Sequence, residues 1–359
     1  MSPIRLLVDT LADEAGFNAQ MTSARDIMSR LDPARFHVTT FCVGKPDPRL
    51  VQRPATRLIQ LPQRRQTLRI LSEFVTGKHD ILFYVKSSPA ARMYLAMRPK
   101  WFDKRVVIGT VESQSDLRNE PTIKSEQIHL WERTVLRSDY LFSNSSSVRE
   151  NLEKEYGLPS EVVPTGVDTK FFTPAWHRAA NSRVRVLFVG SLRPFKGPQL
   201  LLEAAPRFPN AEFVIVGDGF MARELEDRVR LEKLLNVKFA RGLDTSALRE
   251  QYRAADIFLF PSHWEGSPKV ISEAAACGLP VIARADYRPE TVLDGKTGYL
   301  GRSSDELLAH LERLISGPDL RRSMSRAART HIEKFDWDPI TRQWEEIFLR
   351  LAPHKRAAE

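Results

Sequence analysis

Short apolar runs alternate with helix-length amphipathic runs along almost the whole chain of 359 residues. This alternation is required by a parallel sheet in which a helix follows each strand and crosses back over the sheet. The first seven predicted strands are Ile4 to Val8, Phe36 to Cys42, Leu58 to Leu61, Ile81 to Val85, Val106 to Val111, Tyr140 to Ser143 and Glu161 to Pro164. Helices fit between several of these strands, notably at Ala19 to Leu31 and at Val148 to Tyr156. The sequence therefore predicts the α/β fold class.

The pattern starts afresh after a polar stretch from Pro174 to Arg183 that has no apolar period. Five further strands are predicted at Val184 to Val189, Glu212 to Val216, Val237 to Ala240, Ile257 to Phe260 and Val281 to Ala283. We therefore expect a linker at the polar stretch, with an N-terminal domain at 1–174 and a C-terminal domain at 184–335. The remaining segment, 336–359, begins with an amphipathic helix that carries three aromatic and two aliphatic residues on roughly one face. These residues are Trp337, Ile340, Trp344, Ile347 and Phe348.

The composition is that of a globular protein. With 42% hydrophobic residues, the chain can bury two cores of ordinary size. No stretch approaches the roughly 18 apolar residues of a membrane span, and the first residues lack a signal-peptide pattern. We therefore expect a cytoplasmic protein. Cys42 and Cys277 both stand in apolar settings, which favours buried thiols over a disulfide or a metal site.

The charge is unevenly distributed. Residues 1–110 hold 18 Lys and Arg against nine Asp and Glu, whereas residues 111–359 hold 36 of each kind. No acid stands between Asp47 and Glu73, a stretch that contains six arginines. Such a surface suits anionic lipid headgroups or an acidic glycan, and an ordinary solvated face accounts for it equally well. Nucleic acid is disfavoured, because the basic region has few aromatic residues and no binding signature.

Two acids, Glu265 and Glu273, stand eight positions apart around a predicted helix. Ser267 is expected to cap this helix, which covers Pro268 to Cys277, and Gly278 ends it. Glu273 then lies among apolar residues, where an unpaired carboxylate costs several kcal/mol, so it needs a hydrogen-bond partner such as a sugar hydroxyl. The alternative is that Glu265 is a turn residue and Glu273 a surface residue.

The same helix offers an anion site at its beginning. The backbone N–H groups of Lys269 and Val270 belong to the first turn, where they have no partner within the helix and the helix dipole favours negative charge. Phosphate at the helix start and hydroxyl groups at Glu273 together describe a nucleotide sugar.

Two glycine-containing turns follow strands of the second series. In the first, from Gly190 to Gly197, Arg193 and Lys196 stand three positions apart and could hold a diphosphate. A basic surface loop explains this turn as well. The second turn, with Gly217 and Gly219, could be a plain tight turn and does not have the GxGxxG spacing. The position of the two turns favours a ligand-binding site, because each follows a strand of one predicted sheet. They therefore lie at the edge where α/β sheets bind ligands.

With these motifs the chain resembles the retaining, nucleotide-sugar-dependent glycosyltransferases of family four, which have the GT-B fold. The resemblance covers most of the chain and is strongest from Val184 to Leu300. It implies two Rossmann-like domains that face each other across a cleft, and a terminal helix that crosses back to the first domain. The motifs that carry it are Gly190 to Gly197, Val216 to Gly219, Ala255 to Ser262, the Glu265 and Glu273 pair, and Ala276 to Ala283.

The resemblance also implies roles for single residues. Arg193 and Lys196 would offset the charge of the leaving diphosphate in place of a metal ion, and Glu265 would contact hydroxyls of the transferred sugar. Glu273 would accept hydrogen bonds from the ribose. The implied donor-binding residues are Gly16, Glu112, Gly217, Gly219, Ser267, Lys269, Val270 and Glu273. Transfer would proceed through an oxocarbenium-like state with no cofactor or metal, and the leaving phosphate would help to deprotonate the acceptor hydroxyl.

Three positions depart from the pattern of the family. Glu112 stands where many members have a histidine, Gly16 is the single glycine of a loop that usually has a pair, and Ala283 to Glu290 lacks the usual glycines. The alternatives are a nucleotide-sugar-binding protein without turnover and a different GT-B enzyme, such as an epimerase or a phosphorylase. The expected partners are a UDP- or GDP-linked hexose donor and a glycan, lipid-linked glycan or small-molecule acceptor. Peripheral contact with the inner face of an anionic membrane is left open as an alternative to a plain solvated surface.

Overall fold

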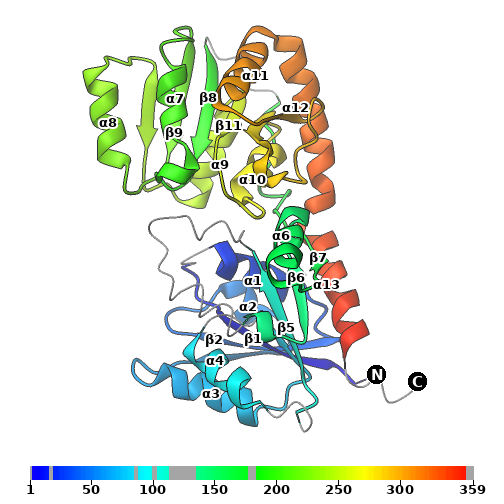
Figure 1. Cartoon of the computed structure of the whole chain (residues 1–359). Coiled ribbons are helices and arrows are strands. Elements are labelled where there is room, and N and C mark those ends of the chain that lie inside the picture. Colours follow the sequence, from blue (N-terminus) through cyan, green and yellow to red (C-terminus); the bar gives the residue numbers. More distant parts are fainter. Residues whose placement is uncertain are drawn as a thin grey trace. The chain divides into compact units, whose positions relative to one another are not determined.

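A computed structural model describes residues 2–15, 19–84, 88–98, 103–112, 135–176 and 183–352. The chain divides into two compact units, which we call unit 1 (Met1–Thr165 with Trp337–Glu359) and unit 2 (Gly166–Asp336). Each unit contains one sheet in which all neighbouring strands run parallel, with helices packed against it (Figure 1). The α/β class predicted from the sequence is therefore confirmed.

Unit 1 has a seven-stranded sheet in the order β3-β2-β1-β4-β5-β6-β7. Its strands are β1 Ile4–Leu11, β2 Phe36–Cys42, β3 Thr56–Gln60, β4 Ile81–Phe83, β5 Val106–Val111, β6 Tyr140–Ser143 and β7 Glu161–Val162. Its described helices include α1 Ala19–Arg30, α2 Pro48–Gln52, α3 Gln66–Thr76, α4 Pro89–Met97, η2 Val135–Arg137, α6 Ser146–Tyr156 and α13 Trp337–Leu351. All seven strands lie where the apolar runs predicted them, within three residues at each end.

Helices cover both faces of this sheet because successive strand residues point to opposite sides. Leu6 belongs to the core shared with α1 and α13, whereas Leu7 belongs to the core shared with α3 and α4. The five residues predicted to form one face of the terminal helix are all buried against unit 1, and the ring of Trp344 lies 4.8 Å from that of Phe83. The predicted packing of this helix on the first domain is confirmed.

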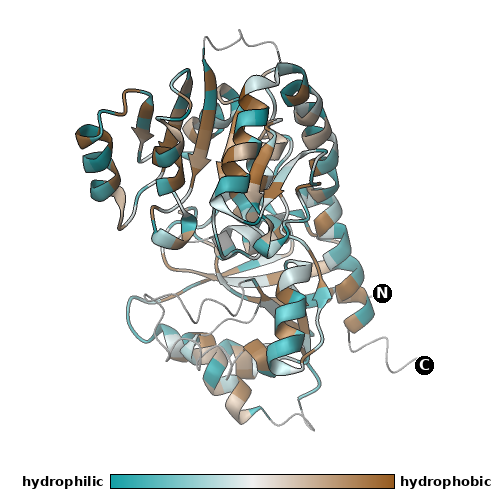
Figure 2. Ribbon diagram, turned by 45° about the horizontal axis from the view of Figure 1, so that its top comes forward, coloured by the Kyte–Doolittle hydropathy of each residue, from teal (hydrophilic) through white to brown (hydrophobic). Residues whose placement is uncertain are grey.

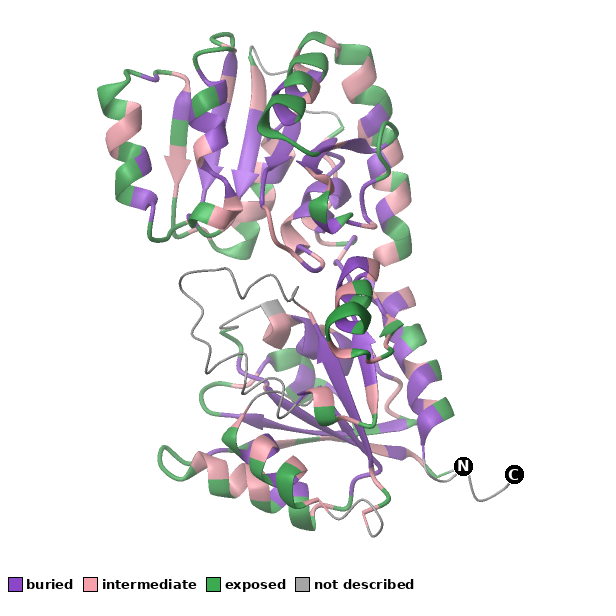
Figure 3. Ribbon diagram, in the orientation of Figure 1, coloured by how far each residue is buried: buried purple, intermediate pink, exposed green. Residues whose placement is uncertain are grey.

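Unit 2 has a six-stranded sheet in the order β10-β9-β8-β11-β12-β13. Its strands are β8 Val184–Val189, β9 Ala211–Val216, β10 Val237–Ala240, β11 Ile257–Phe260, β12 Val281–Arg284 and β13 Gly298–Gly301. Its helices are η3 Pro194–Lys196, α7 Gln199–Ala204, α8 Ala222–Leu231, α9 Thr245–Ala254, α10 Lys269–Ala276, η4 Ala285–Tyr287, α11 Ser304–Ser316, α12 Pro318–Ile332 and η5 Glu333–Phe335. The strands are hydrophobic and mostly buried, as Figures 2 and 3 show.

The sixth strand of unit 2, β13, was not predicted. Its sequence, Gly-Tyr-Leu-Gly, has a glycine at each end, and glycine is a poor strand former. The structure requires the first of them, because a Cβ on Gly298 would lie 2.0 Å from the carbonyl oxygen of Val281 on the neighbouring strand. The close approach of the two backbones therefore explains why Gly298 stands in this strand although glycine has a low strand propensity.

The boundary between the units differs from the linker expected at Pro174 to Arg183, because it follows Thr165. The intervening residues pack within unit 2. Phe172 is buried in the core of that unit, and the Arg329 guanidinium donates hydrogen bonds of 3.1 Å to the carbonyls of Thr169 and Phe172. Polarity alone placed the boundary too late, because these contacts come from a helix far along the sequence.

Both cysteines are buried free thiols, as expected. Burial raises the pKa of Cys277 to about 12, and burial also raises the pKa of Cys42. Within the described ranges, every helix is too short or too polar to reach across a bilayer.

Candidate functional site

The carboxyl ends of four neighbouring strands of unit 2 form one edge of its sheet. Strand β8 lies between β9 and β11, and β12 pairs with the other side of β11. The turns after β8, β9 and β11 carry most of the predicted site residues, and α10 continues the last of these turns. Parallel α/β sheets bind ligands at this edge.

The turn after β8 is the basic one. It contains Arg193, an exposed residue whose side chain forms no hydrogen bond or ion pair with any residue the structure describes, and the short helix η3 that ends at Lys196. Gly197 follows with a φ of 68°, and a Cβ there would lie 2.8 Å from the carbonyl oxygen of Pro261. The turn is thus packed against the end of β11, while Arg193 stays available to a ligand.

Lys196 and Glu265, predicted for different roles, are in contact. The Lys196 ammonium forms an ion pair with Oε1 of Glu265, and the Ser262 hydroxyl donates a hydrogen bond of 2.6 Å to the same oxygen. The ammonium also lies 5.2 Å and 5.4 Å from the ring centres of Phe195 and Phe260. Both charged side chains are largely buried, so the pair is held in a site of low dielectric, where charges act strongly.

Gly217 and Gly219 support the basic turn through the backbone. A Cβ on Gly217 would lie 1.9 Å from the carbonyl oxygen of Gly190, and one on Gly219 would lie 2.7 Å from that of Leu192. Their φ angles of 145° and 154° are also ones that other residues rarely adopt. The two turns therefore pack backbone to backbone, which gives both glycines a structural role independent of any ligand.

The helix after β11 begins one residue later than predicted. Pro268, and not Ser267, occupies the N-cap position, with an extended ψ of 113° and no side-chain hydrogen bond to the helix. Proline fixes φ but has no side-chain acceptor, so the first turn of α10 stays uncapped. The Val270 amide donates to no residue within the described part of the chain. The helix start thus has a donor for an external anion.

Glu273 has a partner within the protein. The Tyr252 hydroxyl of α9 donates a hydrogen bond of 2.9 Å to Oε2 of Glu273, and no described residue donates to Oε1. Burial raises the pKa of Glu273, against the opposing effects of this hydrogen bond and of the Lys269 charge. The burial of Glu273 and its hydrogen bond with Tyr252 contradict the alternative in which it is an ordinary surface residue. One carboxylate oxygen is anchored and the other can accept hydrogen bonds from a ligand.

Glu112 belongs to unit 1, where it follows β5. The hydroxyl of Tyr84 donates a hydrogen bond to its carboxylate, and both residues line a cavity of about 20 Å³ with Asn144. Tyr84 is buried and has a φ of 61°, a left-handed conformation that costs of order 1–3 kcal/mol outside glycine. The structure thus anchors Glu112 firmly, whereas a histidine at this position would offer a donor as well as an acceptor.

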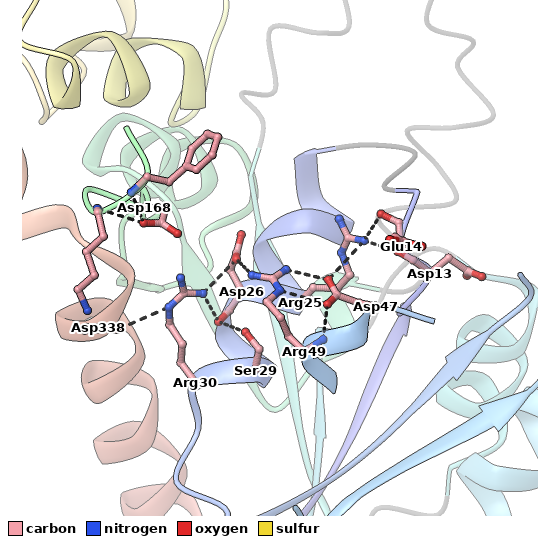
Figure 4. Close-up of polar contacts among 12 residues, drawn as sticks. Asp13, Glu14, Arg25, Asp26, Ser29, Arg30, Asp47, Arg49, Asp168 and Asp338 are labelled. Atoms are coloured by element: carbon pink, nitrogen blue, oxygen red, sulfur yellow. Dashed lines mark hydrogen bonds and ion pairs between the residues drawn. The ribbon is translucent and has the colours of Figure 1, made fainter. Parts of the chain in front are cut away.

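Gly16 lies outside the described residues, but the chain just before it is anchored. The Arg25 guanidinium donates hydrogen bonds to the carbonyls of Asp13 and Glu14, at 2.9 Å for Glu14, and lies 3.7 Å from the Asp47 carboxylate (Figure 4). Arg25 is itself buried. The segment that leads into the Gly16 loop is therefore fixed from α1.

Sequence reasoning missed three residues that hold predicted ones in place: Tyr252, Ser262 and Tyr84. Tyr252 stands 21 positions before Glu273 on a helix with an ordinary amphipathic pattern, so no local signal pointed to the contact. Ser262 could have been found, because a serine three residues before a glutamate is a familiar pair in turns and helix starts.

Two family models together match most of the chain. The model described as glycosyl transferases group 1 matches residues 172–331, and the model described as glycosyltransferase family 4 matches residues 21–171. The two matches meet close to the first boundary between the units.

Similar curated proteins include D-inositol 3-phosphate glycosyltransferases of actinobacteria. That of Geodermatophilus obscurus is 34% identical over 255 residues, which cover 63% of this chain and 56% of the relative. That of Corynebacterium jeikeium is 30% identical over 282 residues, which cover 70% of this chain and 67% of the relative. The chain spans between about half and two thirds of the length of these relatives.

Among solved structures, sucrose-phosphate synthase from Thermosynechococcus elongatus superposes with a TM-score of 0.79. The match covers 99% of this chain and 100% of that chain at 20% sequence identity. Similarity at this level shows a shared fold, which is the GT-B fold expected from the motifs.

Proposed function

Because the chain belongs to the glycosyl transferases of group 1 and to glycosyltransferase family 4, we propose that it transfers a hexose from a nucleotide-diphosphate sugar to an acceptor hydroxyl. The donor is UDP- or GDP-linked, and the configuration at the anomeric carbon is retained. Neither a metal ion nor a further cofactor takes part.

The contact between Lys196 and Glu265 is the observation that carries this proposal. It joins the basic turn after β8 to the acidic turn after β11, next to the uncapped start of α10. Cations, a free helix start and a carboxylate thus gather at one edge of a parallel sheet. A diphosphate linked to a sugar needs this combination of groups, because one end of it is anionic and the other carries hydroxyls.

Each group has a definite task in the transfer. Arg193 and Lys196 stabilise the negative charge that grows on the diphosphate as the bond to the anomeric carbon breaks. The Val270 amide binds a phosphate oxygen. The Oε1 atom of Glu273 accepts hydrogen bonds from the ribose, while Tyr252 holds the other oxygen. Glu265 binds hydroxyls of the hexose through the oxygen that Lys196 and Ser262 do not engage.

The reaction needs no protein side chain as a base. The leaving phosphate accepts the proton of the acceptor hydroxyl on the face of the sugar from which it departs. The new bond therefore forms on that same face, which gives retention. Fixed charges and amides that favour the developing phosphate charge supply the catalysis.

The acceptor we propose is anionic. The curated relatives are named D-inositol 3-phosphate glycosyltransferases, and residues 1–110 of this chain hold 18 basic against nine acidic side chains. A phosphorylated polyol and the phosphate of a lipid-linked glycan both fit such a surface. Offering inositol 3-phosphate beside unphosphorylated inositol measures how far the phosphate determines acceptance.

Release of nucleoside diphosphate tests the proposal. The purified protein is incubated with UDP-glucose, UDP-N-acetylglucosamine and GDP-mannose, with EDTA, and with either acceptor. We expect turnover with one donor, and a loss of at least about tenfold in kcat/KM for Lys196→Gln, since a hydrogen bond to a charged group is worth about 1.5–3 kcal/mol and about 1.4 kcal/mol is tenfold in rate.

Arg322→Gln is the matched control, because Arg322 is an exposed cation of α12 that forms an ion pair with Asp319 of the same helix. Binding of a donor without release of diphosphate under any condition would instead support a nucleotide-sugar-binding protein without turnover.

A further inference from the structure

The helices α3 and α4 form a two-helix surface on unit 1. They lie side by side against one face of its sheet (Figure 1), and the rings of Phe74 and Tyr94 stack between them at 5.2 Å. Their inward residues fill the core on this side of the sheet. The outward side of both helices is largely exposed (Figure 3).

This outward side carries four large apolar side chains. Leu68 and Val75 of α3 are 58% and 56% exposed, and Met93 and Met97 of α4 are 41% and 61% exposed. Leu68 and Val75 stand seven positions apart and Met93 and Met97 four apart, so each pair lies on one side of its helix. We call these four residues the apolar ridge.

The ridge is continuous between the two helices. Val75 and Met97 line the same groove, of about 490 Å³, together with Tyr94 and four charged residues, Arg98, Asp103, Lys104 and Arg105. Apolar side chains from both helices thus meet at an open groove. Apolar residues that gather in this way mark an interaction surface more strongly than scattered ones.

Cations without ion-pair partners among the described residues stand just before and just after α3 and in the groove. Arg64, Arg65, Lys78 and Lys104 are exposed, and none of them forms an ion pair with any residue in the described ranges. Three acids nearby pair with arginines: Glu73, which is buried, with Arg57, Asp103 with Arg105, and Asp139 with Arg98. The surface therefore presents four unpaired cations, whereas each of these acids is already paired with an arginine.

Exposed apolar residues of unit 2 have different surroundings. Leu231 and Leu235 are 77% and 93% exposed, but the nearest basic residues of α8 pair with acids on the same helix, as Arg230 does with Asp227. Lys233, which stands between these two leucines, is exposed and forms no ion pair within the described ranges, so this part of unit 2 has one such cation where the surface on α3 and α4 has four. This contrast also supplies control positions.

We propose that the outward side of α3 and α4 binds the surface of an anionic lipid bilayer. The unpaired cations meet lipid phosphates, and the apolar ridge enters the boundary between headgroups and acyl chains. A second copy of the chain is disfavoured as the occupant, because it would place like charges against one another. The proposal does not depend on the proposed transfer reaction, although it would bring the site to lipid-linked acceptors.

Vesicle flotation tests this surface with the full chain. Vesicles of phosphatidylcholine alone are compared with vesicles that contain about 30 mol% phosphatidylglycerol, whose surface potential is negative. We expect binding to the anionic vesicles that weakens as salt rises, and little binding to the neutral ones. Each cation near such a surface contributes roughly fivefold in affinity.

Two double variants separate charge from apolar contact. Arg64→Gln with Arg65→Asn should weaken binding on the order of twentyfold, and asparagine suits the φ of 62° at position 65. Leu68→Ser with Met97→Ser should weaken the binding that remains at high salt. The matched controls are Arg230→Gln and Leu235→Ser in unit 2, which should bind as the wild type does.

Since all of the substituted residues are exposed, folding should be unchanged, and unaltered nucleotide binding by the variants would verify this. Equal binding to neutral and anionic vesicles, or variants that bind as tightly as the controls, would overturn the proposal. A dimer that forms through this surface, seen by light scattering in the wild type and lost in the Leu68→Ser and Met97→Ser double variant, would overturn it too.

Discussion

The Tyr252 hydroxyl lies 2.9 Å from Oε2 of Glu273 and donates a hydrogen bond to it. Tyr252 is fully buried in the core of unit 2, and its ring packs against Phe172 and Phe258 at 6.0 Å and 5.8 Å. A side chain so fixed sets the position of the carboxylate it contacts. The orientation of Glu273 at the proposed ribose site is therefore determined by α9 as well as by α10.

Replacing Tyr252 by Phe removes this hydrogen bond and keeps the ring. A hydrogen bond to a charged group is worth about 1.5–3 kcal/mol, so nucleotide affinity should fall on the order of tenfold as Glu273 loses its orientation. Calorimetric titration with the preferred nucleotide measures this loss. An unchanged affinity, with the protein folded, would remove Glu273 from the ribose site.

The raised pKa of Glu273 predicts opposite effects of pH on stability and on binding. A carboxyl whose pKa is higher in the folded state than in the unfolded state stabilises the fold fully below the unfolded pKa, and this contribution is lost as the pH rises through the folded pKa. For Glu273 this loss of stability begins near pH 4.5, the ordinary pKa of a glutamate, and continues as the pH rises. Glu273→Gln should therefore gain stability relative to wild type between pH 5 and pH 8.

Urea unfolding at the two pH values measures this difference. The same variant should bind nucleotide more weakly at pH 8, because a neutral amide is a poorer acceptor than a carboxylate. The wild type should lose affinity as the pH falls through the Glu273 pKa. If the difference in unfolding free energy between variant and wild type does not change with pH, the raised pKa of Glu273 is contradicted.

Loss of the Lys196 charge should affect both binding and stability. Lys196→Gln leaves Glu265, a largely buried carboxylate, with Ser262 as its partner among the contacts described, and breaking a buried pair costs about 3–5 kcal/mol at most. Diphosphate affinity should fall by about tenfold or more, since one of two cations is lost. Titration and thermal unfolding of the variant measure the two effects.

Lys238→Gln provides the comparison for that variant. Lys238 also pairs with a glutamate, Glu212, but it is exposed and lies on β10. Exposed pairs contribute about 0–1 kcal/mol, so this variant should change stability little and nucleotide binding not at all. Equal effects of the two lysine variants would show that the loss of a general positive charge, and not the site, is responsible.

Gly217→Ala should destabilise the protein strongly. A Cβ at this position would lie 1.9 Å from the carbonyl oxygen of Gly190, so the turns after β8 and β9 would have to separate. Gly242→Ala is the control, because Gly242 has a φ of 63° and a Cβ there meets nothing within 4 Å. We expect the free energy of unfolding to fall by about 1 kcal/mol in the control and by over about 3 kcal/mol in Gly217→Ala, as measured by urea unfolding.

The fold was largely predictable from the sequence, and the contacts between distant segments were not. Alternating apolar runs located the predicted strands, because buried parallel strands read as short hydrophobic segments. Strand β13 was missed because a glycine stands at each of its ends, and Gly298 is there because the backbone of Val281 lies too close for a side chain. The boundary after Thr165 was misplaced because Arg329, far along the chain, binds the carbonyls that precede the polar stretch.

In the candidate site, too, the local motifs were predictable from the sequence and the contacts between distant residues were not. The glycines, the two acids and the basic turn lie at one edge of the second sheet, as their order in the sequence predicted. The predicted start of α10 was one residue too early, because Pro268 has an extended backbone and is the N-cap, not the first helical residue. Tyr252 was not predictable, since only the packing of α9 against α10 brings it to Glu273.

Calorimetric titration of the purified protein with UDP, GDP, ADP and TDP, without added metal, tests the donor site most directly. We predict that one of these diphosphates binds with a dissociation constant below about 1 mM, equivalent to more than about 4 kcal/mol, and that Lys196→Gln weakens this binding at least about tenfold while Lys238→Gln does not. If none of the four binds at millimolar concentration, or if the lysine variants bind alike, the assignment of Arg193, Lys196 and Glu273 to a nucleotide-sugar site is contradicted.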